Sequence, residues 1–220
     1  YKHFLQMTDS EEALFDYVKA QGFKKIVYLI NSSEIFEMYN LENDDAVDAI
    51  LWIGRPGQEG TKAAAKILSG AVNPSGKTVD TWYTDFTADP TWQNFGDNGI
   101  ASGDRFVYNG REISNYFVDY EEGIYVGYKW YETADAEGFW DSDLAKSTWG
   151  IANGYEDVVQ YPFGYGLSYT TFSQTLGEVT VSEEGDGLVT VPVTVQNTGD
   201  VAGKEVVQVY YSAPYIPGQV

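Results

Sequence analysis

The sequence predicts an α/β region followed by an all-β region, with an aromatic-rich linker region between them. Over residues 1 to about 80, short apolar runs of strand length alternate with amphipathic segments of helix length. From Val189 to Gln196, valines alternate with polar residues, which is the period-two pattern of a β-strand. Residues 81 to about 166 show little periodicity of either kind. We therefore expect part of a mostly parallel sheet with helices, and then part of an antiparallel β-sandwich.

The first helix is predicted to begin after Thr8. Thr8 and Glu11 fit a capping box, in which each side chain accepts a hydrogen bond from the other residue's backbone N–H. The helix should end near Gly22. Its apolar side carries Leu14, Phe15 and Val18. The next run, Ile26 to Ile30, has the unbroken apolar character of a buried strand in a parallel sheet.

A second strand and two further helices follow. We expect a helix from about Glu34 to Tyr39 and a strand from Ala49 to Gly54, which leads through the loop RPGQEG into the helix TKAAAKILSG. Two parallel strands joined by a helical crossover form a βαβ unit. Because only two or three strands are recognisable, we expect this region to be the trailing part of a larger sheet.

The loop after the second strand holds three candidate binding residues. Sheets of this class bind ligands beyond the carboxyl ends of their strands. Arg55, Gln58 and Glu59 lie in that loop and are therefore candidates for substrate binding. A structural salt bridge or a turn contact is the alternative role for each of them.

Aromatic residues dominate the linker region of residues 81–166, where they occupy about a quarter of the positions, well above ordinary composition. Turn signals such as Asn153-Gly154 interrupt it. We expect most of these rings to pack two domains together. An exposed indole can instead stack on the face of a sugar ring, so Trp92, Trp140 and Trp149 are candidate sugar contacts. Of these, Trp92 joins the three loop residues as a candidate for substrate binding.

Residues 167–220 contain three strand-like runs. They are TTFSQTLGEVTV, LVTVPVTVQN and EVVQVYYS, separated by the turn segments EEGDG and QNTGD. This is the start of a sandwich of immunoglobulin or fibronectin type III character, which needs about seven strands. We therefore expect a partial sandwich.

The charge and the residue types exclude several classes of function. With 13 Lys plus Arg against 33 Asp plus Glu, the net charge is −20, which repels nucleic acid and anionic membranes but not a neutral sugar. The chain has no Cys, which excludes disulfides, thiolate metal sites and thiol nucleophiles. Its single His, His3, argues against a Ser-His-Asp triad and a His-rich metal centre. Carboxylates are the abundant acid–base groups.

No targeting signal is expected in this chain. No apolar stretch approaches the roughly 20 residues that span a bilayer, and the residues YKHFLQMTDSEEALF lack the pattern of a signal peptide. A chain that starts at Tyr1 rather than Met is expected to be a segment of a longer protein. Cytoplasmic and secreted locations both remain open.

Four stretches of the chain resemble glycoside hydrolase family 3, in particular its bacterial β-glucosidases. YEEGIYVGYKWYE and YPFGYGLSYTTF are similar to the signature at the join between the second and third domains of that family. LWIGRPGQEGTKAAAKILSGAVNPSGKTVDTW looks like its stretch near the end of the α/β sandwich domain, and NTGDVAGKEVVQVYYSAP like the first strands of its fibronectin type III-like domain. The resemblance runs in the family's order from about Lys24 to Pro214.

The resemblance implies a domain organisation. Residues 1–166 would be the C-terminal part of the α/β sandwich domain, with residues 81–166 as a long aromatic loop region. Residues 167–220 would be the N-terminal part of the fibronectin type III-like domain. The family's TIM-like barrel and the rest of both sandwich domains would lie elsewhere in the same polypeptide or in a partner chain. In some relatives of this kind the domains are circularly permuted.

The resemblance also implies a function. The parent would be a retaining, exo-acting β-glycosidase, foremost a β-glucosidase acting on β-linked oligosaccharides, with β-xylosidase and exo-glucanase also open. The family takes its Asp nucleophile from the barrel and its Glu acid/base from an earlier loop, so no catalytic residue is assigned here. No metal or organic cofactor is implied. This chain would then be scaffold and outer site wall. The alternatives are a non-catalytic carbohydrate-binding or surface module and a purely structural interaction domain.

Overall fold

The computed structural model of the protein describes residues 5–94, 106–108, 110–113, 120–182, 185 and 187–211. The chain divides into two compact units. The first unit is built mainly from Tyr1–Arg55 and Val79–Phe163, and the second from Pro56–Thr78 and Gly164–Ile216. Each unit therefore combines segments that lie far apart in the sequence.

Helix α1 (Asp9–Ala20) begins as the sequence predicts. The Glu11 backbone N–H donates to the Thr8 hydroxyl at 3.3 Å, and the Thr8 backbone N–H donates to the Glu11 carboxylate at 2.7 Å. The predicted capping box is thus confirmed. Phe15 is the buried residue of the helix, and its ring meets the Tyr28 ring edge to face at a centroid distance of 6.1 Å. Leu14, expected on the same apolar side, is instead exposed.

Strands β1 (Val27–Ile30) and β2 (Ala49–Trp52) pair in parallel, with Val27 opposite Ala49, as predicted. The expectation that β1 is buried on both faces is wrong. Ile30 is buried and Tyr28 is half-buried against the core, whereas Val27 and Leu29 are 43% and 41% exposed. Side chains alternate between the two faces of a strand, so among the described residues one face of this sheet is only partly covered.

The helix predicted from about Glu34 to Tyr39 is also wrong. Helix α2 (Tyr39–Glu42) starts where the predicted helix should end. The Glu37 N–H donates to the Leu5 carbonyl at 2.9 Å, and the Met38 N–H donates to the Gln160 side chain at 3.2 Å. Because these backbone donors bond to distant parts of the chain, they are not available for helical bonds.

The aromatic region contains more regular structure than its lack of periodicity suggests. Its described elements are β3 (Trp82–Tyr83), the 3₁₀ helix η1 (Phe86–Ala88), α4 (Pro90–Asn94), β4 (Phe106–Tyr108), β5 (Arg111–Ile113), α5 (Tyr128–Ala136), α6 (Asp143–Trp149), α7 (Tyr155–Val158) and β6 (Val159–Tyr161). Strands β3 and β6 pair antiparallel, as do β4 and β5. Helical periodicity is recognised over a window of about 11–18 residues, and each of these helices is shorter than that. This explains why the sequence did not reveal them.

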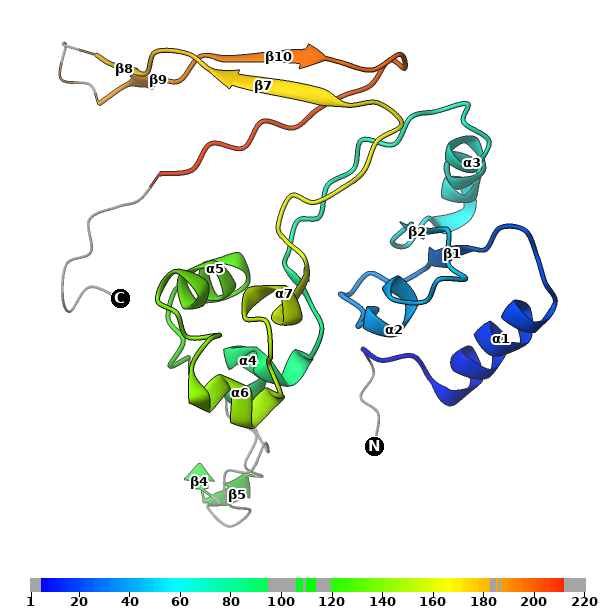
Figure 1. The fold of residues 1–220 in the computed structure, drawn as a ribbon. Coiled ribbons are helices and arrows are strands. Elements are labelled where there is room, and N and C mark those ends of the chain that lie inside the picture. Colours follow the sequence, from blue (N-terminus) through cyan, green and yellow to red (C-terminus); the bar gives the residue numbers. More distant parts are fainter. Residues whose placement is uncertain are drawn as a thin grey trace. The chain divides into compact units, whose positions relative to one another are not determined.

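The aromatic side chains of this region form a core within the first unit. Helices α5, α6 and α7 all contribute to it (Figure 1). Tyr131 and Trp140 are fully buried and stack with ring centroids 5.9 Å apart. The indole N–H of Trp140 donates to the Tyr131 carbonyl, and the Tyr131 hydroxyl donates to the Asp89 carboxylate. The candidate sugar contact at Trp140 is therefore wrong, because no face of its ring reaches solvent.

The described part of the second unit contains α3 (Gly57–Leu68) and four short strands. They are β7 (Phe172–Leu176), β8 (Thr180–Val181), β9 (Val189–Thr190) and β10 (Val193–Asn197). The strand predicted over LVTVPVTVQN is interrupted around Pro192, which has no N–H for a ladder. Strands β7 and β10 pair antiparallel, and β8 pairs with β9. The predicted antiparallel pairing is confirmed, but as two separate two-stranded ladders.

The third predicted strand, EVVQVYYS, is wrong over its described residues, 205–211. They form no ladder with the described strands. The side chain of Gln174 on β7 donates instead to the Glu205 carboxylate at 3.3 Å and to the Val206 carbonyl at 3.4 Å. Side-chain contacts thus hold this segment where backbone pairing was expected.

The motifs NPSGK and YPFGYGLSYTTF meet at one junction in the second unit. The Asn73 side-chain oxygen accepts from the Tyr169 N–H at 2.7 Å and the Ser168 hydroxyl at 2.9 Å, and its amide donates to the Ala202 carbonyl at 3.1 Å. A Cβ at Gly166 would lie 2.2 Å from the carbonyl oxygen of Gly76. Glycine at position 166 therefore permits a close approach of two backbones.

The close contact between the backbones at Gly166 and Gly76 predicts that alanine substitutions at these two glycines have unequal effects on stability. Gly166→Ala forces a methyl group against backbone, so we expect it to lower the free energy of unfolding by about 1–3 kcal/mol. Gly76→Ala is the matched control, because its Cβ would meet no atom within 4 Å. It should stay within about 0.5 kcal/mol of the parent in urea titrations. Equal destabilisation by both would contradict the assigned contact.

Candidate functional site

The first unit has a cavity at the carboxyl ends of its two parallel strands. We call it the strand-end cavity, and its volume is about 340 Å³. It is lined by Leu5, Ser33, Glu34, Ile35, Trp52, Val79, Asp80, Trp82 and Tyr83. Ser33 and Glu34 follow β1, and Trp52 is the last residue of β2. The position is the one at which open α/β sheets hold ligands.

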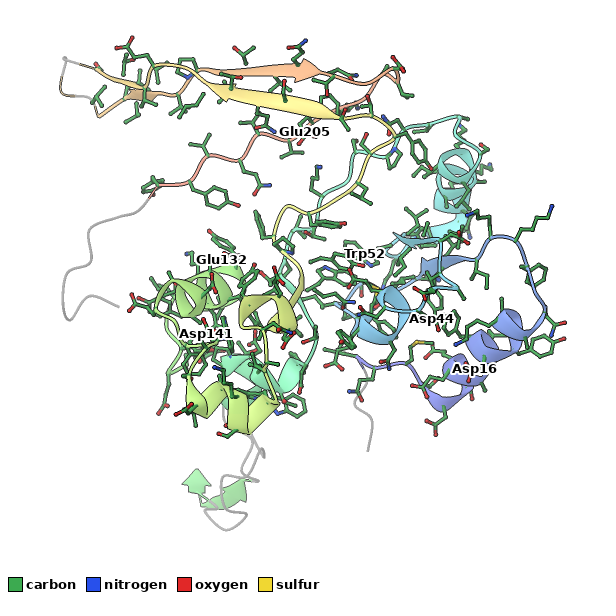
Figure 2. The ribbon with its side chains drawn as sticks, in the orientation of Figure 1. Asp16, Asp44, Trp52, Glu132, Asp141 and Glu205 are labelled. Carbon is green, nitrogen blue, oxygen red and sulfur yellow. The ribbon has the colours of Figure 1, made fainter. Side chains whose placement is uncertain are left out.

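Two indoles form the apolar wall of the strand-end cavity. Trp52, labelled in Figure 2, meets Trp82 edge to face with ring centroids 5.2 Å apart. The Trp52 indole N–H donates to the Ser32 carbonyl at 2.6 Å, which fixes the ring over the end of β1. Trp82 is buried, whereas Trp52 is 37% exposed. Trp52 therefore offers an aromatic surface to a bound molecule, and the buried Trp82 ring packs against the Trp52 ring.

The two acidic residues of the strand-end cavity differ in electrostatic environment. A hydrogen bond from Ser33 is the main cause that lowers the pKa of Glu34; desolvation opposes it, and the nearby charge of Arg55 adds to the lowering. Burial raises the pKa of Asp80, and the Asp89 charge adds to this, although the Thr81 N–H opposes it. Glu34 is thus an ionised acceptor near neutral pH, and Asp80 is the carboxyl that more readily holds a proton.

The contacts of Asp80 point to a structural role. One of its carboxylate oxygens accepts from the Thr81 N–H at 2.9 Å. The same oxygen lies 3.1 Å from the position of a Cβ at Gly127, whose φ of +56° favours glycine. Asp80 therefore packs against the turn that starts α5. These contacts account for Gly127 in the motif YEEGIYVGYKWYE.

The structure places Arg55 beside the strand-end cavity, but not in its lining. Its guanidinium lies 3.2 Å from the Glu34 carboxylate, so the loops after β1 and β2 are joined by an ion pair. The salt bridge that was the alternative reading for Arg55 is present. Both side chains are largely exposed, so the pair also remains open to a ligand. Substrate binding by Arg55 stays a prediction.

The other three predicted residues lie elsewhere. Gln58 and Glu59 belong to the second unit, in the first turn of α3, which begins four residues before the expected helix. Both are exposed, and Glu59 pairs with Lys62 on the same helix. Trp92 lies in α4 and meets the Phe86 ring edge to face at 5.1 Å. Their roles in substrate binding stay predictions.

Sequence reasoning missed Glu34, Trp52, Asp80 and Trp82. Glu34 was assigned to a helix that does not form, although it follows β1 as Arg55 follows β2. The rule that selected the loop after the second strand would have selected Glu34 as well. Asp80 and Trp82 come from a segment about 50 residues beyond β1, and no local pattern links them to the sheet. Only the tertiary fold brings them there.

The described residues contain neither a cluster of metal ligands nor a helix that could span a membrane. No three His, Cys, Asp or Glu side chains among them are arranged to hold a metal ion. No helix in that part of the chain is both long and apolar enough to cross a bilayer. The hydroxyl and carboxylate groups that line the strand-end cavity can form hydrogen bonds with a ligand that carries hydroxyls.

The two sides of the strand-end cavity should respond differently to truncation. Trp82→Ala removes a buried ring and should cost about 3–5 kcal/mol of unfolding free energy. Arg55→Ala removes a solvent-exposed partner of an ion pair, so the urea midpoint should not move measurably. Urea titrations followed by far-UV circular dichroism measure both. A large loss in Arg55→Ala would show that the ion pair, rather than the indole pair, holds this edge of the sheet.

Comparisons with known proteins agree on one family. The model of the glycosyl hydrolase family 3 C-terminal domain matches residues 2–128. Beta-glucosidase A of Butyrivibrio fibrisolvens is 34% identical over an alignment 221 positions long, which covers 94% of this chain and 22% of that protein. An exo-α-(1→6)-L-arabinopyranosidase of Bifidobacterium longum is 33% identical over 216 residues, 98% of this chain and 22% of that protein.

Solved structures give the same likeness at the level of the fold. Beta-glucosidase 3B of Thermotoga neapolitana, in complex with α-D-glucose, matches with a TM-score of 0.61 and 31% identity, over 89% of this chain and 22% of that one. A β-glucosidase of Paenibacillus barengoltzii matches with a TM-score of 0.60 and 29% identity, over 88% of this chain and 17% of that one. The chain thus spans about a fifth of the length of the relatives it matches.

Proposed function

The chain belongs to glycosyl hydrolase family 3, and on that premise we propose that it is part of a retaining, exo-acting β-glycosidase. The proposed enzyme is a β-glucosidase that removes terminal glucose from β-linked oligosaccharides. The observation that carries this proposal is the 34% identity to a β-glucosidase over 94% of the chain. The net charge of −20 is compatible with a neutral substrate of this kind.

We assign this chain the role of scaffold and outer site wall. Retaining glycoside hydrolysis needs two carboxyl groups about 5 Å apart, one as nucleophile and one as acid/base. In the strand-end cavity, Glu34 is engaged by Arg55, and Asp80 packs against the turn at Gly127. Glu34 is thus an ion-paired acceptor and Asp80 a structural contact, and we assign neither of them to the cleavage step. The nucleophile and the acid/base are proposed to come from segments outside this chain, in the same polypeptide or a partner.

The composition of the strand-end cavity supports the proposal that this chain forms the outer wall of the substrate site. Trp52 presents a partly exposed ring, and the ion pair of Glu34 and Arg55 offers an acceptor and donors beside it. An aromatic face with a few polar groups around it is the usual composition of a small-molecule site. The proposed contact is with the part of the oligosaccharide beyond the bond that is cleaved.

A second candidate is an exo-acting arabinopyranosidase. Two relatives that bear this name are each 33% identical to the chain, against 34% for the β-glucosidases of Butyrivibrio fibrisolvens and Ruminococcus albus. An arabinopyranoside lacks the hydroxymethyl group of a glucoside, so the two substrates differ where the terminal sugar is recognised. The residues that distinguish them are proposed to lie outside this chain.

Two preparations test the proposal. The 220-residue chain alone should not hydrolyse an aryl β-D-glucoside, because it lacks the proposed catalytic carboxyls. The longer polypeptide that carries this chain together with a barrel should release aryl alcohol from that substrate, and more slowly from the matching α-L-arabinopyranoside and β-D-xyloside. Turnover by the chain alone would refute the assignment of both carboxyls to other segments. A preference for the arabinopyranoside would select the second candidate.

A further inference from the structure

The first unit contains a second and larger cavity, of about 600 Å³, which we call the Trp149 cavity. It is lined by Gln6, Met7, Glu12, Glu37, Tyr39, Asn40, Thr84, Asp85, Ala88, Trp149, Gly150, Ile151, Ala152, Asn153, Asp157 and Val158. It shares no lining residue with the strand-end cavity. Its volume lies within the range of about 300–1,000 Å³ that small-molecule sites occupy.

One wall of the Trp149 cavity is the segment from Trp149 to Asp157, and contacts along this segment fix its conformation. Trp149 is the last residue of α6, and Gly150 turns the chain in the left-handed conformation, with φ at +71°. Ile151 is buried in the aromatic core, which anchors the turn. The Asp157 carboxylate accepts from the Ala152 and Asn153 N–H groups, both at 2.7 Å. The segment from Trp149 to Asp157 is therefore preorganised.

Two of the acidic residues that line the cavity, Glu37 and Asp157, are bound to protein donors. Both oxygens of Glu37 accept hydrogen bonds, from the Gln6 amide at 2.8 Å and the Phe86 N–H at 2.6 Å. Asp157 likewise accepts on both oxygens, the second from the Asn153 amide at 3.0 Å. Among the residues that the structure describes, no Lys, Arg or His lines the cavity. Carboxylates held in this way present fixed acceptor oxygens to the hydroxyl groups of a ligand.

Trp149 supplies the apolar surface of the cavity. Its ring is half-buried, packs against the aromatic core and lies 6.3 Å from the Phe139 ring between centroids. Tyr39 and Asn40, at the start of α2, are exposed at the cavity and add a phenol and an amide. A flat ring with amides and acceptor oxygens around it matches the alternating apolar and hydroxyl surfaces of a sugar.

We propose that the Trp149 cavity is a binding site for a short neutral saccharide, with a sugar ring stacked on the indole of Trp149. The hydroxyls of the sugar donate to carboxylate oxygens of the cavity and accept from the amides at its rim. The proposed site binds the saccharide without cleaving it, and all of its lining residues belong to this chain. It does not depend on where the carboxyls that cleave the substrate lie.

The test is binding of cellotetraose to the 220-residue chain, measured by calorimetry and by saturation transfer in NMR. Trp149→Ala should weaken binding by roughly tenfold or more, since it removes the stacked face. Ala152→Arg places a long side chain at the cavity without removing a core contact, and it should abolish binding. Tyr17→Ala is the control, because Tyr17 is an exposed aromatic residue of α1 that lines neither cavity. Circular dichroism verifies that each variant is folded.

Three results would overturn the proposal. One is an absence of cellotetraose binding by the parent chain. Another is unchanged binding in Ala152→Arg, which is informative even if Trp149→Ala fails to fold. The third is clearly tighter binding of a cationic glucosamine tetramer than of cellotetraose, which would make the cavity a site for positive charge. Hydrolysis of aryl glucosides plays no part in this test, so its outcome is separate from that of the proposed enzyme activity.

Discussion

The parallel pairing of β1 with β2 is the constraint on which the first unit depends. Two parallel strands place their carboxyl ends at the same edge, so the loops that follow them meet there. At that edge Glu34 from the first loop pairs with Arg55 from the second, and Trp52 closes the end of β2. The same pairing leaves Val27 and Leu29 partly exposed on one face. One interaction therefore positions the strand-end cavity and creates an apolar surface.

Elements with local signals were predicted from the sequence. The capping box of Thr8 and Glu11 is complete within four residues, so the start of α1 could be read directly. The two parallel strands were found because each is a short apolar run. The helix predicted near Glu34 failed because the backbone donors of that segment bond to Leu5 and Gln160, which no local pattern reveals. Local sequence patterns thus predicted α1, β1 and β2, and the helix near Glu34 failed because contacts with distant residues determine the backbone there.

The candidate site was predicted only in part for the same reason. Arg55 was found because it follows an obvious strand, and it lies at the predicted edge. Asp80 and Trp82 reach the strand-end cavity from a remote segment. Trp140 and Trp149 show that residue type and region do not predict which tryptophan is accessible to a ligand, because both lie in the same aromatic region. Trp140 is buried in the core, whereas Trp149 lines a cavity. Which of two like residues meets a ligand depends on packing that the sequence does not display.

Both units present apolar strands that the described residues leave uncovered. In the second unit, Leu176 on β7 and Val195 on β10 are 64% and 41% exposed. Exposed strand edges and faces of this kind favour association with other chains. Sedimentation velocity of the 220-residue chain alone tests this most directly. The account predicts concentration-dependent association through these surfaces. A single monomeric species across the whole concentration range would contradict it.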